Sequence, residues 1–132
     1  MPIHHAIDRE RSRIRTTCTG LVGLDEVFQH FRMLEDERQL PQPLDVLLDL
    51  SGISSVPDAA QIQSVAGVIW RMLDKVSWGN CAIVATSDLV YGVSRILEVR
   101  SEESFLATQV FREIDAAEGW LDSERALRSR PK

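Results

Sequence analysis

The stretch between Asp45 and Asp58 limits the fold of this chain more than any other part of the sequence. It starts with a nearly continuous apolar run, Val46-Leu47-Leu48-Asp49-Leu50, which breaks at Ser51-Gly52. A short run of this kind is typical of a parallel strand that is covered on both faces of its sheet. The stretch ends in Ser-Val-Pro-Asp, which has the residue types of a helix start, so we predict a helix beginning near Ser55. A buried strand that passes directly into a helix predicts an α/β architecture.

The rest of the chain alternates between a period of two residues, which indicates strands, and a period of 3.6, which indicates helices. Strands over 3–7 and 13–19 flank a polar turn and are expected to pair as a hairpin. The later predicted elements are a helix over 24–34, the strand over 44–50, the helix from Ser55, a strand over 81–85, a helix from Ser87 to about Val99, a strand over 108–111 and a helix over 115–121. We therefore predict an α/β domain with a small mixed, mostly parallel five-stranded sheet and about four helices, in the order β-β-α-β-α-β-α-β-α.

Length and charge restrict the domain organisation and the partners. The 132 residues fit one domain, which we place at 1–122; residues 123–132 hold few apolar side chains and several cations, which predicts a disordered basic tail. The net charge is −5 and the basic residues are scattered, so nucleic acid is not expected as a partner. No apolar run approaches the roughly 18 residues of a membrane span, and the N-terminus turns charged before a signal-peptide core develops. We expect a cytoplasmic protein without a transmembrane segment.

Two helices allow a prediction of which side chains face the core. In the second helix the 3.6-residue period turns an apolar stripe toward the sheet and leaves Trp70 on the flank, partly exposed. In the third helix the same period places Tyr91 and Arg95 together on the outward side. The residues expected in the core are Ile62, Val65, Ile69 and Leu73 of the second helix and Leu89, Val93, Ile96 and Leu97 of the third.

Motifs for catalysis, metal binding or cofactor binding are incomplete in this sequence. His4, His5 and His30 have no partner at metal-ligand spacing. The segment 20–23 is too short for a phosphate-binding loop, and Ser94 lies in Gly-Val-Ser-Arg, which lacks the second glycine of a nucleophile elbow. The two cysteines, Cys18 and Cys81, each fall inside a predicted strand and are expected to be free and buried, with a disulfide as the disfavoured alternative. We therefore predict a protein that is not an enzyme and has no metal and no cofactor.

The order of elements, with Leu48-Asp49-Leu50-Ser51-Gly52 closing the middle strand, resembles the STAS fold of anti-anti-sigma factors. The later segments are similar to the SpoIIAA-like subgroup of the STAS-domain superfamily, and the likeness covers nearly the whole chain. These segments are Ala82-Ile83-Val84-Ala85, Tyr91-Gly92-Val93-Ser94-Arg95, and Val110-Phe111-Arg112 leading to Ala117 and Trp120-Leu121. The resemblance implies one of two uses: docking onto a partner protein, or holding a small apolar ligand.

The sequence departs from the anti-anti-sigma pattern at the start of the second helix. In those factors a serine there is phosphorylated, and the added charge breaks docking to the partner. Here Ala59 occupies the best-matching position, so we predict no phosphorylation switch through this helix. Ser54 and Ser55 lie upstream, where such a switch would need altered geometry.

The candidate binding residues gather where the middle strand ends, because open α/β sheets place ligands at the carboxyl ends of their strands. They are Asp49, Ser51, Ser54, Ser55 and Asp58 in the loop, with Trp70, Tyr91 and Arg95 as flanking surface. The same residue types also fit an ordinary strand-to-helix turn with a capping box, and Tyr91 with Arg95 also fits an exposed stacking pair.

Three functions are consistent with these residues. The first is a non-enzymatic binding module for an unidentified protein, which could be a second copy of the chain. Its binding surface would be an open patch formed by Trp70, Val68 and the loop around Ser55. The second is a carrier or sensor of a small apolar ligand, which would lie between the second and third helices near Trp70 and Met72. This function requires a cavity of roughly 300 Å³ or more, and Leu97 is also expected to line it. The third is an enzyme in which Asp49 and Asp88 form a paired-carboxylate site.

Overall fold

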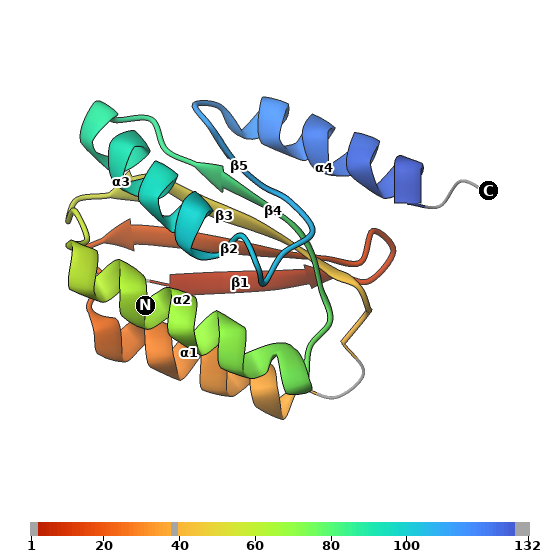
Figure 1. Ribbon diagram of the computed structural model, residues 1–132. Helices are drawn as coiled ribbons and strands as arrows, with labels where there is room; N and C mark the ends of the chain where they lie inside the picture. The colour runs from red at the N-terminus through yellow and green to blue at the C-terminus, as the bar shows by residue number, and fades with distance from the viewer. Residues whose placement is uncertain (1–2, 38–39, 129–132) are drawn as a thin grey trace.

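The computed structural model describes residues 3–37 and 40–128. Within these residues five strands form one sheet in the spatial order β1-β2-β3-β4-β5, which is also their order along the chain (Figure 1). The strands are β1 (Ile3–Asp8), β2 (Arg13–Gly20), β3 (Leu44–Ile53), β4 (Trp78–Val84) and β5 (Thr108–Phe111). β1 and β2 are antiparallel, and β2 to β5 pair in parallel. The predicted mixed, mostly parallel sheet is confirmed.

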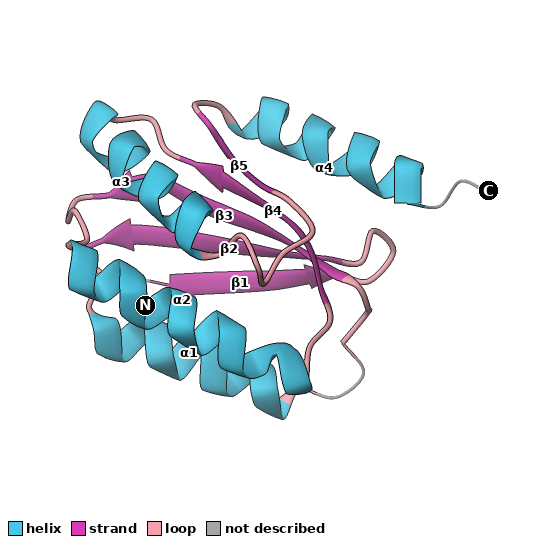
Figure 2. Ribbon diagram, in the orientation of Figure 1, coloured by secondary structure: helices cyan, strands magenta, loops and turns pink. Residues whose placement is uncertain are grey.

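Helices cover both faces of this sheet (Figures 1 and 2). On one face lie α1 (Leu24–Asp36), α2 (Ala59–Arg71) and α3 (Asp88–Arg100), and on the other lies α4 (Ile114–Arg128). Side chains alternate along a strand, so β3 and β4 supply both cores. Leu47, Ala82 and Val84 pack against α4, whereas Val46 and Ile83 belong to the core under the other helices. The central strands are covered on both sides, as their apolar sequences predict.

Helix α2 begins at Ala59, four residues after the predicted start at Ser55. Asp58 is the N-cap: its carboxylate accepts a hydrogen bond from the Gln61 backbone N–H at 2.8 Å, and the Gln61 side chain accepts one from the Asp58 N–H at 2.9 Å. This reciprocal capping box needs a glutamine or glutamate three residues after the cap, which Asp58 has and Ser55 lacks. The Ser55 hydroxyl instead accepts a hydrogen bond from the Val22 N–H at 3.3 Å.

The predicted core face of α2 is correct except at its end. Ile62 and Ile69 are buried, Val65 is half-buried, and Trp70 is 53% exposed as expected. Leu73 was predicted to be buried and is 38% exposed. The α-helix gives way at residue 72 to a 3₁₀ turn, η1 (Met72–Asp74), whose tighter winding buries Met72 and turns Leu73 outward.

Helix α3 has the predicted N-cap but only part of the predicted core face: Val93 and Leu97 are half-buried, and Leu97 packs against the core. The Ser87 hydroxyl accepts a hydrogen bond from the Val90 N–H at 3.2 Å. Val90 and Ser94 are the buried residues of this fully described helix, whereas Leu89 is 72% and Ile96 is 44% exposed. The helix carries two overlapping apolar stripes, and its packing against α2 and β5 selects the one that starts at Val90.

Helix α4 extends to Arg128, beyond the predicted end at residue 121. Residues 123–128 are therefore helical, and the prediction of a disordered tail is wrong for them; residues 129–132 lie outside the described part of the chain. Ion pairs hold this helix to the sheet. The fully buried Arg13 binds Glu118 at 2.8 Å and Asp122 at 2.7 Å, and Arg128 binds the buried Asp45 at 2.9 Å.

Candidate functional site

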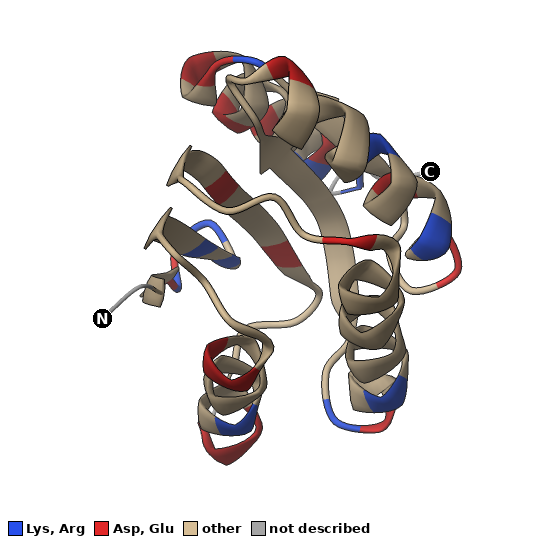
Figure 3. Cartoon of the chain, turned by 90° about the vertical axis from the view of Figure 1, so that its left-hand side faces the viewer, with Lys and Arg blue, Asp and Glu red and all other residues tan. Residues whose placement is uncertain are grey.

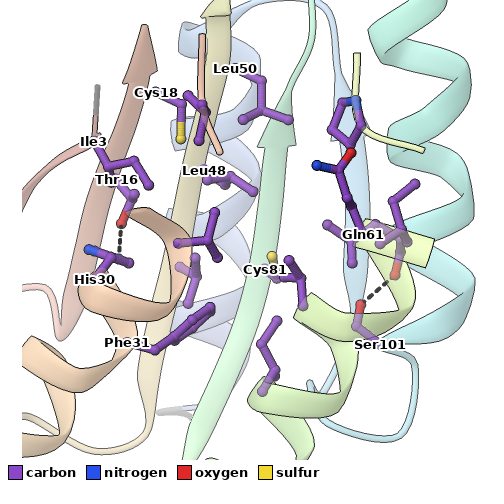
Figure 4. A pocket seen from close by; sticks show the side chains of 18 of the residues that line it. Ile3, Thr16, Cys18, His30, Phe31, Leu48, Leu50, Gln61, Cys81 and Ser101 are labelled. Atoms are coloured by element: carbon purple, nitrogen blue, oxygen red, sulfur yellow. Dashed lines mark hydrogen bonds between the residues drawn. The ribbon is translucent and has the colours of Figure 1, made fainter. Parts of the chain in front are cut away.

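A cavity of about 150 Å³ lies between the sheet and the helices α1 and α2 (Figure 4). Its floor comes from β1, β2, β3 and β4, and its roof from α1 and α2, with Leu97 of α3 also in the wall. Floor residues include Thr16, Cys18, Val46, Leu48, Leu50 and Cys81, and roof residues include Val27, His30, Phe31, Gln61, Ile62 and Val65. The site thus combines segments that are far apart in the sequence.

The cavity exists because α1 packs loosely on the sheet. The apolar residues of α1 at positions 24, 27, 28, 31 and 34 form one stripe, but within this fully described helix Leu34 is the buried member. The sheet residues beneath it, Val46, Leu48 and Leu50, are half-buried. The helix therefore covers the sheet without filling the space below it.

Polar atoms in the wall are few and uncharged near neutral pH. The His30 Nε2 and the Thr16 hydroxyl lie 3.4 Å apart at one side of the cavity, and Gln61 and Ser101 lie at the other side (Figure 4). Burial, with the neighbouring His5 as a second cause, lowers the pKa of His30 from 6.5 to about 4. The Ser101 hydroxyl already donates a hydrogen bond to the Leu97 carbonyl at 2.7 Å, and the Gln61 carbonyl oxygen serves the α2 capping box.

Both cysteines are free and buried, as predicted, and both line the cavity. Burial raises the pKa of Cys18 to about 11 and that of Cys81 to about 12, with the charges of Asp49 and Asp45 as smaller causes. Both thiols are therefore protonated at neutral pH. They belong to β2 and β4 with β3 between them, a separation of roughly 9 to 10 Å that no disulfide spans.

The five residues of the predicted loop lie near the carboxyl ends of β2 and β3, but two of them are in a strand. The break predicted at Ser51-Gly52 is wrong, because β3 continues to Ile53 and includes Asp49 and Ser51, whereas Ser54, Ser55 and Asp58 lie in the loop that follows. The Asp49 carboxylate accepts hydrogen bonds from the Ser51 N–H at 2.9 Å and the Ser51 hydroxyl at 2.6 Å. The Ser54 N–H donates to the Gly20 carbonyl at 2.9 Å. Ser54, through Gly20, and Ser55, through Val22, join the β3–α2 loop to the β2–α1 loop, whereas Asp58 caps α2. Their use in binding stays a prediction.

Trp70 does not extend this loop into one surface. It lies at the far end of α2, about 18 Å along the helix axis from Asp58. Val68, the other residue expected in an open patch, packs against the core. The patch predicted from Trp70, Val68 and the loop around Ser55 is therefore divided between the two ends of the helix.

The predicted Tyr91–Arg95 pair is wrong. Tyr91 packs against the core, and the guanidinium of Arg112 lies over its ring, with Cζ 4.0 Å from the ring centroid. Arg95 pairs with Glu98 at 3.5 Å instead. Arg112 also binds Asp88 at 2.9 Å, a contact between residues 24 apart that no local spacing indicates. The difference follows from the shifted face of α3.

The apolar-ligand hypothesis gave the wrong place and the wrong size for the cavity. The cavity lies under α1 and α2, not between α2 and α3, and it has about half the expected volume. Leu97 lines it as predicted, but Met72 and Trp70 do not. The enzymatic hypothesis has no support in the geometry of Asp49 and Asp88, because Asp49 binds Ser51 and Asp88 binds Arg112.

The part of the chain that the structure describes holds no candidate metal site and no candidate membrane-spanning helix. Among residues 3–37 and 40–128, no group of three or more histidine, cysteine, aspartate and glutamate side chains could hold a metal ion. No helix in these ranges is both long enough and apolar enough to cross a membrane.

Comparison with known proteins adds one structural likeness. No model of a protein family matches the chain, and no curated protein is significantly similar to it. The crystal structure of an uncharacterised protein of the DUF3478 family from Shewanella loihica PV-4, described as having a SpoIIAA-like fold, is similar, with a TM-score of 0.61. The match covers 90% of this chain and 93% of that one at 16% identity, which shows the fold alone. The chain therefore has a SpoIIAA-like fold, as the resemblance of its sequence predicted.

Proposed function

We propose that this protein is a non-enzymatic binding module whose ligand is a small apolar molecule seated in the cavity between α1, α2 and the sheet. The single observation that carries the proposal is the cavity of about 150 Å³ with its largely aliphatic and aromatic wall. Protein interiors are otherwise close-packed, with few voids larger than a water molecule. This space is partly open, and it leaves the apolar side chains that line it without close packing partners, which costs stability. A ligand that fills the space recovers part of that cost.

The size of the cavity limits the ligand. An engineered cavity of about 150 Å³ in another protein, lined by leucine, isoleucine and phenylalanine, stays dry and binds benzene. The expected ligand here has about the volume of one six-membered ring or of a short aliphatic chain. A longer molecule requires α1 to move, and among the helices that line the cavity α1 has the fewest buried side chains.

Docking to a protein is the second candidate, and one observation favours it. Leu89, Ile96 and Val99 are exposed on α3 at spacings that place them on one side of the helix. Apolar side chains gathered on one helix face mark protein interfaces more often than single exposed ones do. This surface is separate from the cavity, so the two uses can be tested independently.

Calorimetric titration of the protein with toluene, compared with a cavity-filling variant, tests the proposal. Val65 lines the cavity and is half-buried, so Val65→Phe should occupy part of the space and weaken toluene binding at least about tenfold. The matched control is Ile96→Phe, an exposed residue of α3 that does not line the cavity. The proposal is wrong if toluene does not bind, or if both variants bind it as the unmodified protein does.

A further inference from the structure

We propose that the cavity selects uncharged ligands that carry one hydroxyl group, such as small alcohols and phenols, and rejects carboxylates of the same size. This inference rests on the proposed function and names the chemical class of its ligand. Three features of the described residues carry it: the charge of the wall, the charge of the rim, and the position of one polar pair.

The wall offers no counter-charge to an ionised ligand. Among the described residues that line the cavity, none is aspartate, glutamate, lysine or arginine. The titratable side chains there are His30, Cys18 and Cys81, and burial keeps all of them neutral at pH 7. Burying a carboxylate without a cation or several hydrogen-bond donors costs desolvation free energy. This cost is larger than the favourable free energy of burying the apolar part of a ligand of this size.

The rim does not favour an anionic head group either. The loops at the carboxyl ends of β2 and β3 enter the cavity wall at Val22, Gly23, Ile53 and Pro57. Residues 18–31 and 46–70, which include both loops, contain no lysine or arginine, and their charged residues are Asp25, Glu26, Asp49 and Asp58. Figure 3 looks onto this side of the molecule and shows acidic but no basic segments where the chain enters α1 and α2. An amphiphile that left its carboxylate beside these two loops would meet like charge from their side chains.

Arg112, at the carboxyl end of the sheet beyond β5, does not change this balance. It is bound to Asp88 at 2.9 Å and to the Thr86 carbonyl at 3.1 Å, and its guanidinium covers Tyr91. Its partners lie on the α3 side of the sheet, away from the β2–α1 loop.

One polar pair in the wall suits a ligand hydroxyl. The Thr16 hydroxyl and the His30 Nε2 face each other at 3.4 Å, which is at the long limit of a hydrogen bond. A neutral imidazole has one donor and one acceptor nitrogen, and a threonine hydroxyl can both donate and accept. A ligand hydroxyl between or beside them therefore finds a partner for its proton and for its oxygen. Ligand sites commonly combine an apolar wall with a few polar groups that fix orientation in this way.

Titrations with a matched set of probes test the ligand class. Toluene, benzyl alcohol and benzoate share one ring and differ in the attached group. At pH 7.5 we expect benzyl alcohol to bind at least as tightly as toluene, and benzoate to bind roughly 100-fold more weakly than benzyl alcohol. Thr16→Val removes the hydroxyl of this buried residue and keeps its shape. This variant should bind benzyl alcohol several-fold more weakly and bind toluene with unchanged affinity. Thr19→Val, at an exposed position on the same strand that does not line the cavity, is the control.

The outcomes separate this inference from the function on which it rests. If benzoate binds as tightly as benzyl alcohol, or if Thr16→Val weakens toluene and benzyl alcohol equally, the ligand class is wrong while the cavity remains a binding site. If neither toluene nor benzyl alcohol binds, the proposed function is wrong and the inference fails with it. A benzoate affinity that rises to that of benzyl alcohol only when a cation is introduced by Val27→Lys would confirm the role of the uncharged wall.

Discussion

At the scale of single residues, His30 connects the cavity to the stability of the protein. Its ring lies in the roof of the cavity, contacts Thr16, and meets the ring of His5 edge-on with centroids 5.1 Å apart. A histidine held in such a place is neutral, because the charged form would lose its hydration and lie next to a second histidine. The residue therefore makes the folded state sensitive to acid.

We predict that His30 causes a loss of stability as the pH falls from about 6.5 to about 4. The pKa of His30 is about 4 in the folded protein and 6.5 when solvated, so in this window the unfolded chain binds a proton that the folded chain does not. The contribution is fully favourable above pH 6.5 and declines toward pH 4 by about 2 to 3 kcal/mol. Urea unfolding at pH 7.5 and pH 4.5 should show a smaller decline in His30→Gln than in the unmodified protein. His4→Gln, at an exposed position of β1, should keep the full decline; an equal effect of both variants would contradict the assignment.

At the scale of elements, α4 is joined to the sheet through charges as well as apolar packing. Asp45 is fully buried and accepts hydrogen bonds from the Asn80 N–H at 2.8 Å and from Arg128 at 2.9 and 3.3 Å. Gly79 belongs to the same arrangement, because a Cβ at this position would overlap the Asp45 carboxylate. The last turn of α4 thus neutralises a charge at the start of β3.

We predict that Arg128→Ala destabilises the protein by about 3 kcal/mol or more, because it leaves the buried Asp45 carboxylate without a cation. Chemical denaturation measures the change. Arg100→Ala, which removes an exposed cation from the last turn of α3, should change the free energy of unfolding by less than about 0.5 kcal/mol. Adding Asp45→Asn to Arg128→Ala should recover part of the loss. A cost below about 1 kcal/mol for Arg128→Ala would show that the ion pair does not hold the end of α4.

At the scale of the whole molecule, the helices are held to the sheet to different degrees. The described residues of β4 are all buried, and α4 is held by two buried apolar residues and several ion pairs. Helix α1 has Leu34 as its buried residue and a cavity under its middle. The free energy of local opening is lowest where few apolar side chains are buried. We therefore expect a ligand to enter the cavity by displacement of α1.

We predict that amide hydrogen exchange in α1 is faster than in α2 and α4, and that a bound ligand slows it. Exchange followed by mass spectrometry, with and without saturating benzyl alcohol, measures both effects. Protection should increase in 24–36 and remain unchanged in 114–128, since α4 lies on the opposite face of the sheet. Equal protection of α1 and α4 in the free protein would contradict the idea that α1 is the movable wall.

The sequence alone determined the order and type of the elements. The apolar run over 44–50, the cap at Ser87 and the strand over 108–111 are visible in neighbouring residues. The structure has the cap and the last strand where the pattern predicts them, and the middle strand continues three residues further, to Ile53. The candidate loop residues, such as Asp49 and Asp58, also reach the predicted edge of the sheet. These features depend on hydrogen bonds and periodicity within a few residues, and such local interactions can be read from a sequence.

The tertiary structure decided which helix face is buried, where α4 ends, and where the cavity lies. The two apolar stripes of α3 are alternatives that only its neighbours α2 and β5 resolve. The last turn of α4 is held by Asp45, which is 83 residues away in the chain, and the cavity forms where four strands and three helices meet. Each of these depends on the distance between segments that pack without being adjacent in sequence. Periodicity predicts that the stripe on α1 faces the sheet, but it contains no information on how closely the helix approaches, and the space left beneath α1 is the candidate site.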